Sequence, residues 1–276
     1  MRVAAGRRRE TRSPATGASA APTPASAADA LKAEDFVLTA GPETAGLMEV
    51  SVPAMPGPLS SSEIEEIIAR AAECFGTPYE VRPTEVYNGP PFVDDKDRPL
   101  LFVTSTSAIV TEEDAAAEIA ALQRPEYTRC LAEMTAEKIA AELEETGVVT
   151  TGSGGDTSAG IVSAGVAPAL SVRSAPPPSG ATAPAEAVLA ARSSNGVSVE
   201  ILSAQLVPPP PGATAGIEMV FGISGPAGVL ECHIYRASVV DRRVDTTVAV
   251  QRFGGPPDQA LINRLVEQLV RKVSNQ

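Results

Sequence analysis

The sequence has little of what most catalytic and metal sites are built from. It holds one histidine, His233, three cysteines and no tryptophan among 276 residues. A Ser-His-Asp or Cys-His site would have to use His233, and a zinc site would have to gather widely scattered ligands. We therefore expect no catalytic residue, no metal ligand and no cofactor.

Two short segments lack the residues that would turn them into known binding motifs. The glycine-rich run Gly152–Gly155 has Thr157 where a dinucleotide loop needs glycine, and no Gly-Lys-Ser/Thr follows it. The aspartates Asp94, Asp95 and Asp97 lack the loop glycine and distal glutamate of a calcium loop. The first segment reads as linker and the second as a solvated turn.

Basic residues are also fewer than acidic ones. The chain has 22 Lys and Arg and 34 Asp and Glu, which gives a net charge of −12. The basic residues cluster only at Arg7–Arg9 and Arg12, which argues against nucleic acid as a partner. The sequence contains no run of about 18 apolar residues, so it predicts no membrane-spanning helix. No apolar segment of a signal peptide follows the arginines. On this basis alone the chain reads as soluble and cytoplasmic.

Two segments have a composition that buries too little apolar surface to fold. Residues 1–30 read as a disordered tail or tether, and residues 147–185 form a Gly/Ser/Pro/Ala-rich linker. The remainder suffices for one core. We therefore expect a single domain over residues 31–276, interrupted by this linker.

Helical spacing dominates the first half of the domain. Ser62 and Glu65 form a capping-box pattern, and Thr111 caps a second helix. A slip of the apolar spacing predicts a kink or break near Thr135. The expected elements are a helix over 61–76, a strand over 98–110, a helix after 111 and a helix from 125 to 147.

Past the linker the apolar period changes from 3.6 to 2, which indicates strands. Short turns between the last three strands predict an antiparallel meander, and an amphipathic helix closes the chain. The fold class is α+β, with this four-strand meander, one earlier strand, and helices packed on one face of the sheet. The strands are expected over 197–206, 216–224, 228–240 and 243–253.

Four segments carry a resemblance to a known family. They are AAECFG at 71–76, LLFVTSTSAIV at 100–110, LQRPEYTRCL at 122–131, and VAVQRFGGPPDQALINRLVEQLVRKV at 248–273. In them the chain resembles the PknH-like extracellular sensor domain of bacterial receptor kinases and secreted lipoproteins, over residues 31–147 and 186–276. The resemblance implies helices on an antiparallel sheet, a cleft, disulfides, and binding without catalysis. The linker is longer than this family leads one to expect.

The three cysteines allow at most one intramolecular bridge. Cys74 ends one helix and Cys130 lies in the first turns of another, where backbones can approach to the ~5.5 Å that a disulfide needs. Cys232 lies in mid-strand among apolar residues. We favour a Cys74–Cys130 disulfide with Cys232 as a buried free thiol, in agreement with what the resemblance implies. Three buried free cysteines in a cytoplasmic protein are the alternative.

These observations favour a non-catalytic extracytoplasmic sensor or ligand-binding domain, although the sequence shows no signal peptide. Its partner would be a small molecule, a cell-envelope component or a protein, and no motif identifies the ligand-binding residues. A cytoplasmic interaction module of similar fold is the first alternative. A hydrolase that uses acidic residues is the second.

Overall fold

The computed structural model of the chain describes residues 31–52, 55–75, 81–94, 101–145, 190–192, 197–225 and 228–276. Residues Leu31–Gln276 group as one compact unit. The predicted tail at 1–30 and the predicted linker at 147–185 lie outside the described residues. None of the helices in this described part combines the length and the apolar character that a membrane span requires.

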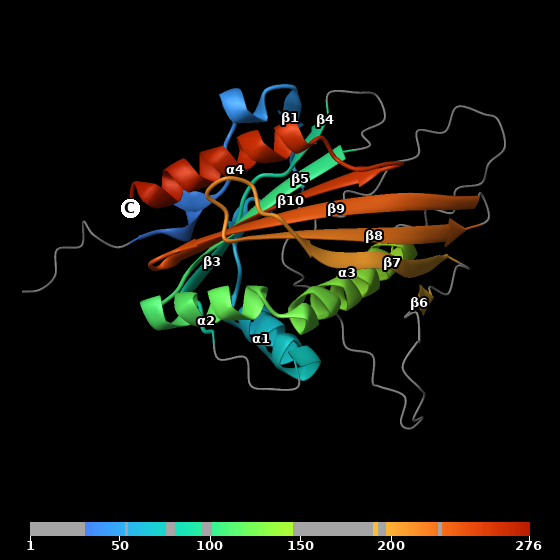
Figure 1. Ribbon diagram of the computed structural model, residues 1–276, viewed down its shortest axis with the longest axis horizontal. Coiled ribbons are helices and arrows are strands. Elements are labelled where there is room, and N and C mark those ends of the chain that lie inside the picture. The colour runs from blue at the N-terminus through green and yellow to red at the C-terminus, as the bar shows by residue number, and fades with distance from the viewer. Residues whose placement is uncertain are drawn as a thin grey trace, which may run out of the picture. The chain divides into compact units, whose positions relative to one another are not determined.

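Ten strands form one antiparallel sheet (Figure 1), in the order β1-β4-β5-β10-β9-β8-β7-β6, while β3 pairs with β5 and β2. The four long strands β7 to β10 follow one another as a meander, so the predicted fold class is confirmed. The strands are β1 (Leu47–Glu49), β2 (Gly57–Pro58), β3 (Glu85–Asn88), β4 (Phe92–Asp94), β5 (Leu101–Ile109), β6 (Ala190–Arg192), β7 (Ser198–Val207), β8 (Ala215–Gly225), β9 (Gly228–Asp241) and β10 (Val244–Phe253).

The helices cover both faces of this sheet, whereas the sequence predicts helices on one face. Figure 1 shows α4 on one side of the long strands and α1, α2 and α3 on the other. Two 3₁₀ turns, η2 and η3, accompany α4. The helical elements are α1 (Ser61–Phe75), α2 (Glu112–Leu122), α3 (Pro125–Glu145), α4 (Gln259–Ser274), η2 (Ala33–Phe36) and η3 (Pro42–Thr44).

The reason for the two covered faces lies in β9, which is apolar on both sides. Cys232 and Ile234 belong to the core with α2 and α3, whereas Tyr235, Ala237 and Val239 belong to the core with α4. Side chains alternate across a strand, so a continuous apolar run leaves two surfaces to bury. Three helices take one surface and α4 takes the other.

Two helix details differ from expectation. The capping box of α1 is made by Ser60 and Glu63, two residues before the predicted pair, with Ser60 N–H donating to Glu63 Oε2 at 2.7 Å. The helix α3 continues through Thr135 without a break. Thr135 Oγ1 instead donates to the carbonyl of Leu131 at 2.7 Å, which satisfies the hydroxyl within the helix. The predicted cap of α2 by Thr111 is confirmed.

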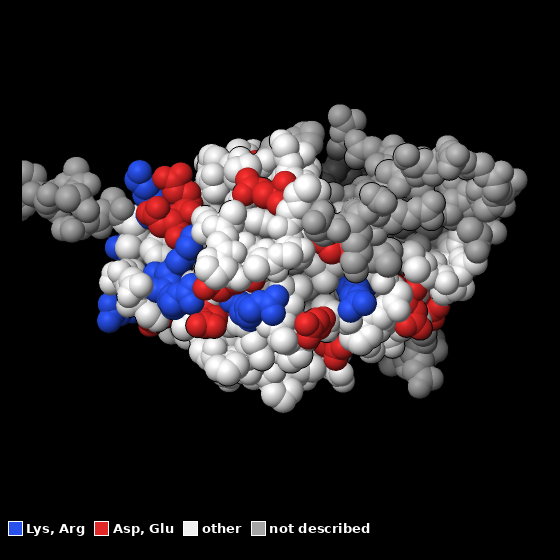
Figure 2. All heavy atoms as spheres, turned by 90° about the horizontal axis from the view of Figure 1, so that it is seen from above, with Lys and Arg blue, Asp and Glu red and all other residues white. Residues whose placement is uncertain are grey.

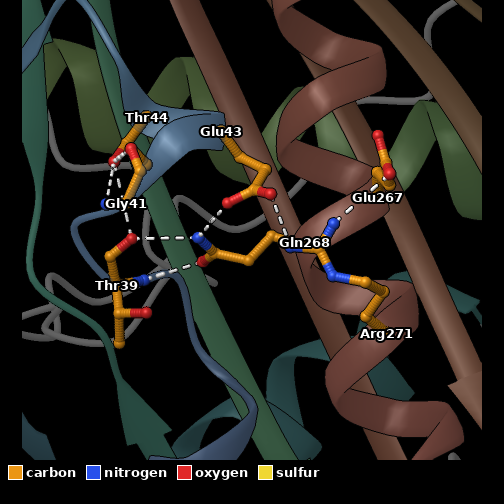
Figure 3. A network of polar contacts seen from close by, with 7 residues as sticks. All are labelled: Thr39, Gly41, Glu43, Thr44, Glu267, Gln268 and Arg271. Atoms are coloured by element: carbon orange, nitrogen blue, oxygen red, sulfur yellow. Dashed lines mark hydrogen bonds and ion pairs between the residues drawn. The ribbon is translucent and has the colours of Figure 1, made fainter.

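The segment that precedes β1 is fastened to α4 by a polar network (Figure 3). The side chain of Gln268 accepts a hydrogen bond from Thr39 N–H at 2.8 Å and donates to the Thr39 carbonyl at 3.0 Å. Arg271 pairs with Glu43 of η3. Because these groups lie on the α4 side, the network does not reach the opposite core of α2 and α3.

The surface over α4 carries charges of both signs. Figure 2, which views the molecule from above, shows Lys and Arg side chains lying among Asp and Glu rather than gathered in one field. On this face the described cations and anions therefore lie close enough to offset one another in part.

Candidate ligand-binding site

The helix α1 is attached to α3 by two links. Cys74 and Cys130 form a disulfide with their Cα atoms 5.7 Å apart, which is the pairing favoured from the sequence. Arg70 also pairs with Glu137. Among the described side chains of α1, only Ile68 and Ala71 are buried. The helix is therefore a thin outer layer, held against α3 mainly from its C-terminal half.

Beneath α1 lies a cavity of about 150 Å³. Its walls are apolar and come from α1, from α3, and from the segment that leads into β3. Several of these side chains, among them Ile64 and Met134, are only partly buried because they face the open space. The apolar wall consists of Ile64, Ile67, Ile68, Ala71, Val81, Pro83, Val86, Ala108, Val110, Leu131 and Met134, together with Cys130 of the disulfide.

The floor of the cavity is polar, in contrast to its walls. Glu118 reaches it from α2, Tyr127 from α3, Arg236 from β9 and Asp245 from β10. In the sheet, Asp245 is paired with Ala108 of β5, which also lines the cavity. Two pairs of elements that are distant from each other in the sequence, α2 with α3 and β9 with β10, therefore deliver two carboxylates, a guanidinium and a phenol to one place.

The electrostatics of this floor are dominated by burial. Burial and the neighbouring Glu118 carboxylate together raise the pKa of Asp245 to about 7, and Arg236 offsets part of their effect. Burial and the same carboxylate also raise the pKa of Tyr127. The Tyr127 hydroxyl donates to Glu118 Oε1 at 3.3 Å. Asp245 therefore holds its proton up to a higher pH than a solvated aspartate does.

Two atoms of the floor have no hydrogen-bond partner among the described residues. They are Asp245 Oδ1 and Arg236 Nε, and both are buried. An unsatisfied buried polar group costs roughly 1–3 kcal/mol, and more when it is charged. The fold thus maintains an acceptor and a donor that a bound molecule could satisfy.

A second hollow, of about 440 Å³, lies beside the prolines Pro208–Pro211 that connect β7 to β8. Pro256, Pro257 and the buried Tyr235 also line it. Prolines and polar side chains form most of its wall, and Val207 and Ile262 are its aliphatic lining residues. The cavity beneath α1 is the better candidate for a small apolar ligand.

Of the other residues singled out in the sequence, Cys232 and His233 do not line this cavity. Cys232 is a free, buried cysteine, and burial raises its pKa to about 12. His233 lies on the opposite face of β9, with Nε2 3.2 Å from Glu231 Oε2. In the described part of the chain, no three His, Cys, Asp or Glu side chains gather as a metal site would require. Asp95 and Asp97 lie outside the described residues.

The sequence reasoning missed the three charged residues of the floor. A signal was present, because Arg236 falls at the same strand parity as Cys232 and Ile234 and therefore points toward an apolar core. A charged residue at such a position is rarely buried without a partner. Asp245 similarly lies in a strand, β10, whose one other charged residue is the exposed Arg252 near its end.

No protein-family model and no curated protein sequence matches the chain. Among solved structures, the chain is similar to the extracellular domain of PknH from Mycobacterium tuberculosis, with 10% sequence identity and a TM-score of 0.34. The match covers 80% of this chain and 99% of that chain. Similarity at this level transfers no function, and membership of the sensor-domain family stays a prediction.

Proposed function

We propose that this protein is a non-catalytic binding domain that takes the apolar part of a small molecule into the cavity beneath α1. One observation carries the proposal, namely an apolar cavity that ends on a few convergent polar groups. Ligand sites have this composition, since apolar walls supply affinity and a small number of polar groups fix orientation. A perturbed carboxyl group such as Asp245 in a cavity is a further mark of such sites.

The absence of catalysis is part of the proposal, and the shape of the cavity supports it. A hydrolase would use Glu118 and Asp245 as its acid and base, and it would need water beside them. About 150 Å³ is the volume of a cavity that holds one benzene molecule. A glycoside together with its attacking water is larger than this space, so the binding function is preferred.

An extracytoplasmic location also belongs to the proposal. It is supported by the disulfide between Cys74 and Cys130, because cytosolic reductants keep most thiols reduced. A domain of this kind would sense or carry a small molecule or a component of the cell envelope.

The test compares two substitutions on one helix. Ala71→Leu places a larger side chain in the cavity, whereas Ala69→Leu places the same side chain on the exposed side of α1. Toluene serves as the probe and is titrated into isotope-labelled protein while the amide resonances are followed by NMR. We expect the wild type and Ala69→Leu to bind toluene with equal affinity. We expect Ala71→Leu to bind it about tenfold more weakly or worse.

Because alanine and leucine are both good helix formers, the two variants should fold alike. Circular dichroism and thermal unfolding of both variants check this point. Toluene that leaves the resonances of the cavity residues unchanged in the wild type would refute the proposed site. Equal binding by Ala71→Leu and Ala69→Leu would do the same.

A further inference from the structure

The polar floor of the cavity indicates the chemistry of the ligand. This inference rests on the function proposed above. We infer that the cavity selects a neutral molecule with a benzene-sized apolar body and one polar head that both donates and accepts a hydrogen bond. A hydroxyl group is the simplest head of this kind, and a primary amide is another.

The need for a donor and an acceptor follows from the two unsatisfied atoms. Asp245 Oδ1 accepts a hydrogen bond when the carboxyl is ionised, and also when the carboxyl is protonated on its other oxygen, whereas Arg236 Nε–H can only donate. A purely apolar molecule would leave both atoms buried and unpaired. A hydroxyl group can donate to Asp245 and accept from Arg236 at once, so it removes both penalties.

The preference for a neutral head follows from the mixed charges of the floor. A cation would be attracted by Asp245 and Glu118 but would lie beside the guanidinium of Arg236. An anion would be attracted by Arg236 but would lie beside two carboxyl groups. Either ion would also lose its hydration on entering an apolar cavity, and such a loss is large unless a single well-placed partner compensates it.

The charges of the groups that face Asp245 are consistent with the preference for a neutral head. Glu118 of α2 and Arg236 of β9 carry opposite charges, and Tyr127 of α3 is a phenol. The cavity residues of α1 and β5 are uncharged. When Asp245 is protonated, Glu118 and Arg236 offset each other, and the floor presents no net charge to a ligand.

Four one-ring probes separate these effects in the intact wild-type protein. Phenol and toluene differ only by a hydroxyl in place of a methyl group, benzylammonium adds a cation, and benzoate adds an anion. Affinities are measured by NMR titration or calorimetry at about pH 6, below the pKa of Asp245. We expect phenol to bind about tenfold more tightly than toluene. We expect both ions to bind more weakly than toluene.

A pair of variants assigns the preference to the floor. Asp245→Val removes the carboxyl with a side chain that suits a strand, and Asp241→Val makes the same change at an exposed position at the end of β9. The ratio of toluene to phenol dissociation constants should fall from about ten to about one in Asp245→Val. It should be unchanged in Asp241→Val. The wild-type comparison stands by itself if Asp245→Val does not fold.

The outcomes distinguish this inference from the proposed function. If toluene and phenol bind equally in the wild type, the inference is wrong while the binding function stands. Tighter binding of benzylammonium or benzoate than of phenol also overturns the inference alone. If none of the four probes binds, both the inference and the proposed function fail.

Discussion

Cys74 of α1 is bonded to Cys130 of α3, and the Cys130 side chain also lines the cavity. The bridge therefore joins the outer wall of the candidate site to the helix behind it. The two cysteines are 56 positions apart, so the bridge restrains a long loop of the unfolded chain. In the chain-entropy model such a crosslink adds about 4 kcal/mol of stability.

The first prediction is a thiol count. Protein made in an oxidising compartment and denatured without reductant should show one free thiol, and peptide mapping should place it at Cys232, because Cys74 and Cys130 are paired. A count of three free thiols would show that the disulfide does not form, and it would remove the main support for an extracytoplasmic location. Reduced protein serves as the control and should show all three.

The second prediction concerns the reactivity of Cys232. This thiol is fully buried in the core beneath α3, and its pKa is raised to about 12 by burial. A thiol that is neither ionised nor accessible reacts slowly. Maleimide should therefore leave Cys232 unmodified in native protein and label it in urea. Rapid labelling without denaturant would contradict the register of β9.

The third prediction is a decline of stability with pH that depends on Asp245. The pKa of this carboxyl is raised from 3.8 to about 7 on folding. Between these pH values the folded protein keeps a proton that the unfolded chain has released. The free energy of unfolding should therefore fall by on the order of a few kcal/mol as the pH rises through this window. Above it, Asp245 should contribute no further change.

Urea unfolding at several pH values from about 5 to 8 measures this decline. Asp245→Asn is the matched variant, because it keeps the shape of the side chain and does not titrate. Its stability should change less with pH than that of the wild type. Hydrogen bonds from Arg271 and Ser60 lower the pKa values of Glu43 and Glu63 below the ordinary value of 4.5, so both groups titrate below the pH range of this measurement. Parallel curves for the two proteins would show that Asp245 is not the group responsible.

The fourth prediction concerns the network of Figure 3. Gln268 is 5% exposed and bonds both backbone groups of Thr39. Gln268→Ala leaves these groups without partners and should lower the free energy of unfolding by about 2 kcal/mol. Gln259→Ala, on an exposed turn of the same helix, should change it by less than about 0.5 kcal/mol. Equal effects in urea unfolding would show that the network does not stabilise the fold.

The fifth prediction tests the proposal of a single domain over residues 31–276. The strand β5 pairs with β10 from Leu101↔Arg252 to Ile109↔Val244, so the two halves of the chain share one sheet. Residues 31–147 and 186–276, produced together as separate chains, should therefore co-purify through a tag on either one. Two fragments that fold alone and do not associate would indicate two domains instead.

The sequence by itself determined the four helices, the long strands β5 and β7 to β10, and the faces of β9, but it did not predict the short strands β1 to β4 and β6. The period of two in β9 places Cys232 and His233 on opposite faces, and this is the arrangement in the structure. The same local pattern correctly predicted the meander of β7 to β10. Such features depend on the pleat and on short turns, which a few neighbouring residues control.

Tertiary structure alone decided which face each helix covers and which side chains meet in the cavity. The apolar stripe of α4 fits either face of a sheet, and its placement opposite α3 follows from the packing of the whole chain. Glu118 and Asp245 are separated by more than half of the domain, and they meet because α2 packs against β9, the strand that pairs with β10. Local periodicity carries no information on such long-range pairing, since contacts between distant segments are chosen by the burial of the complete core.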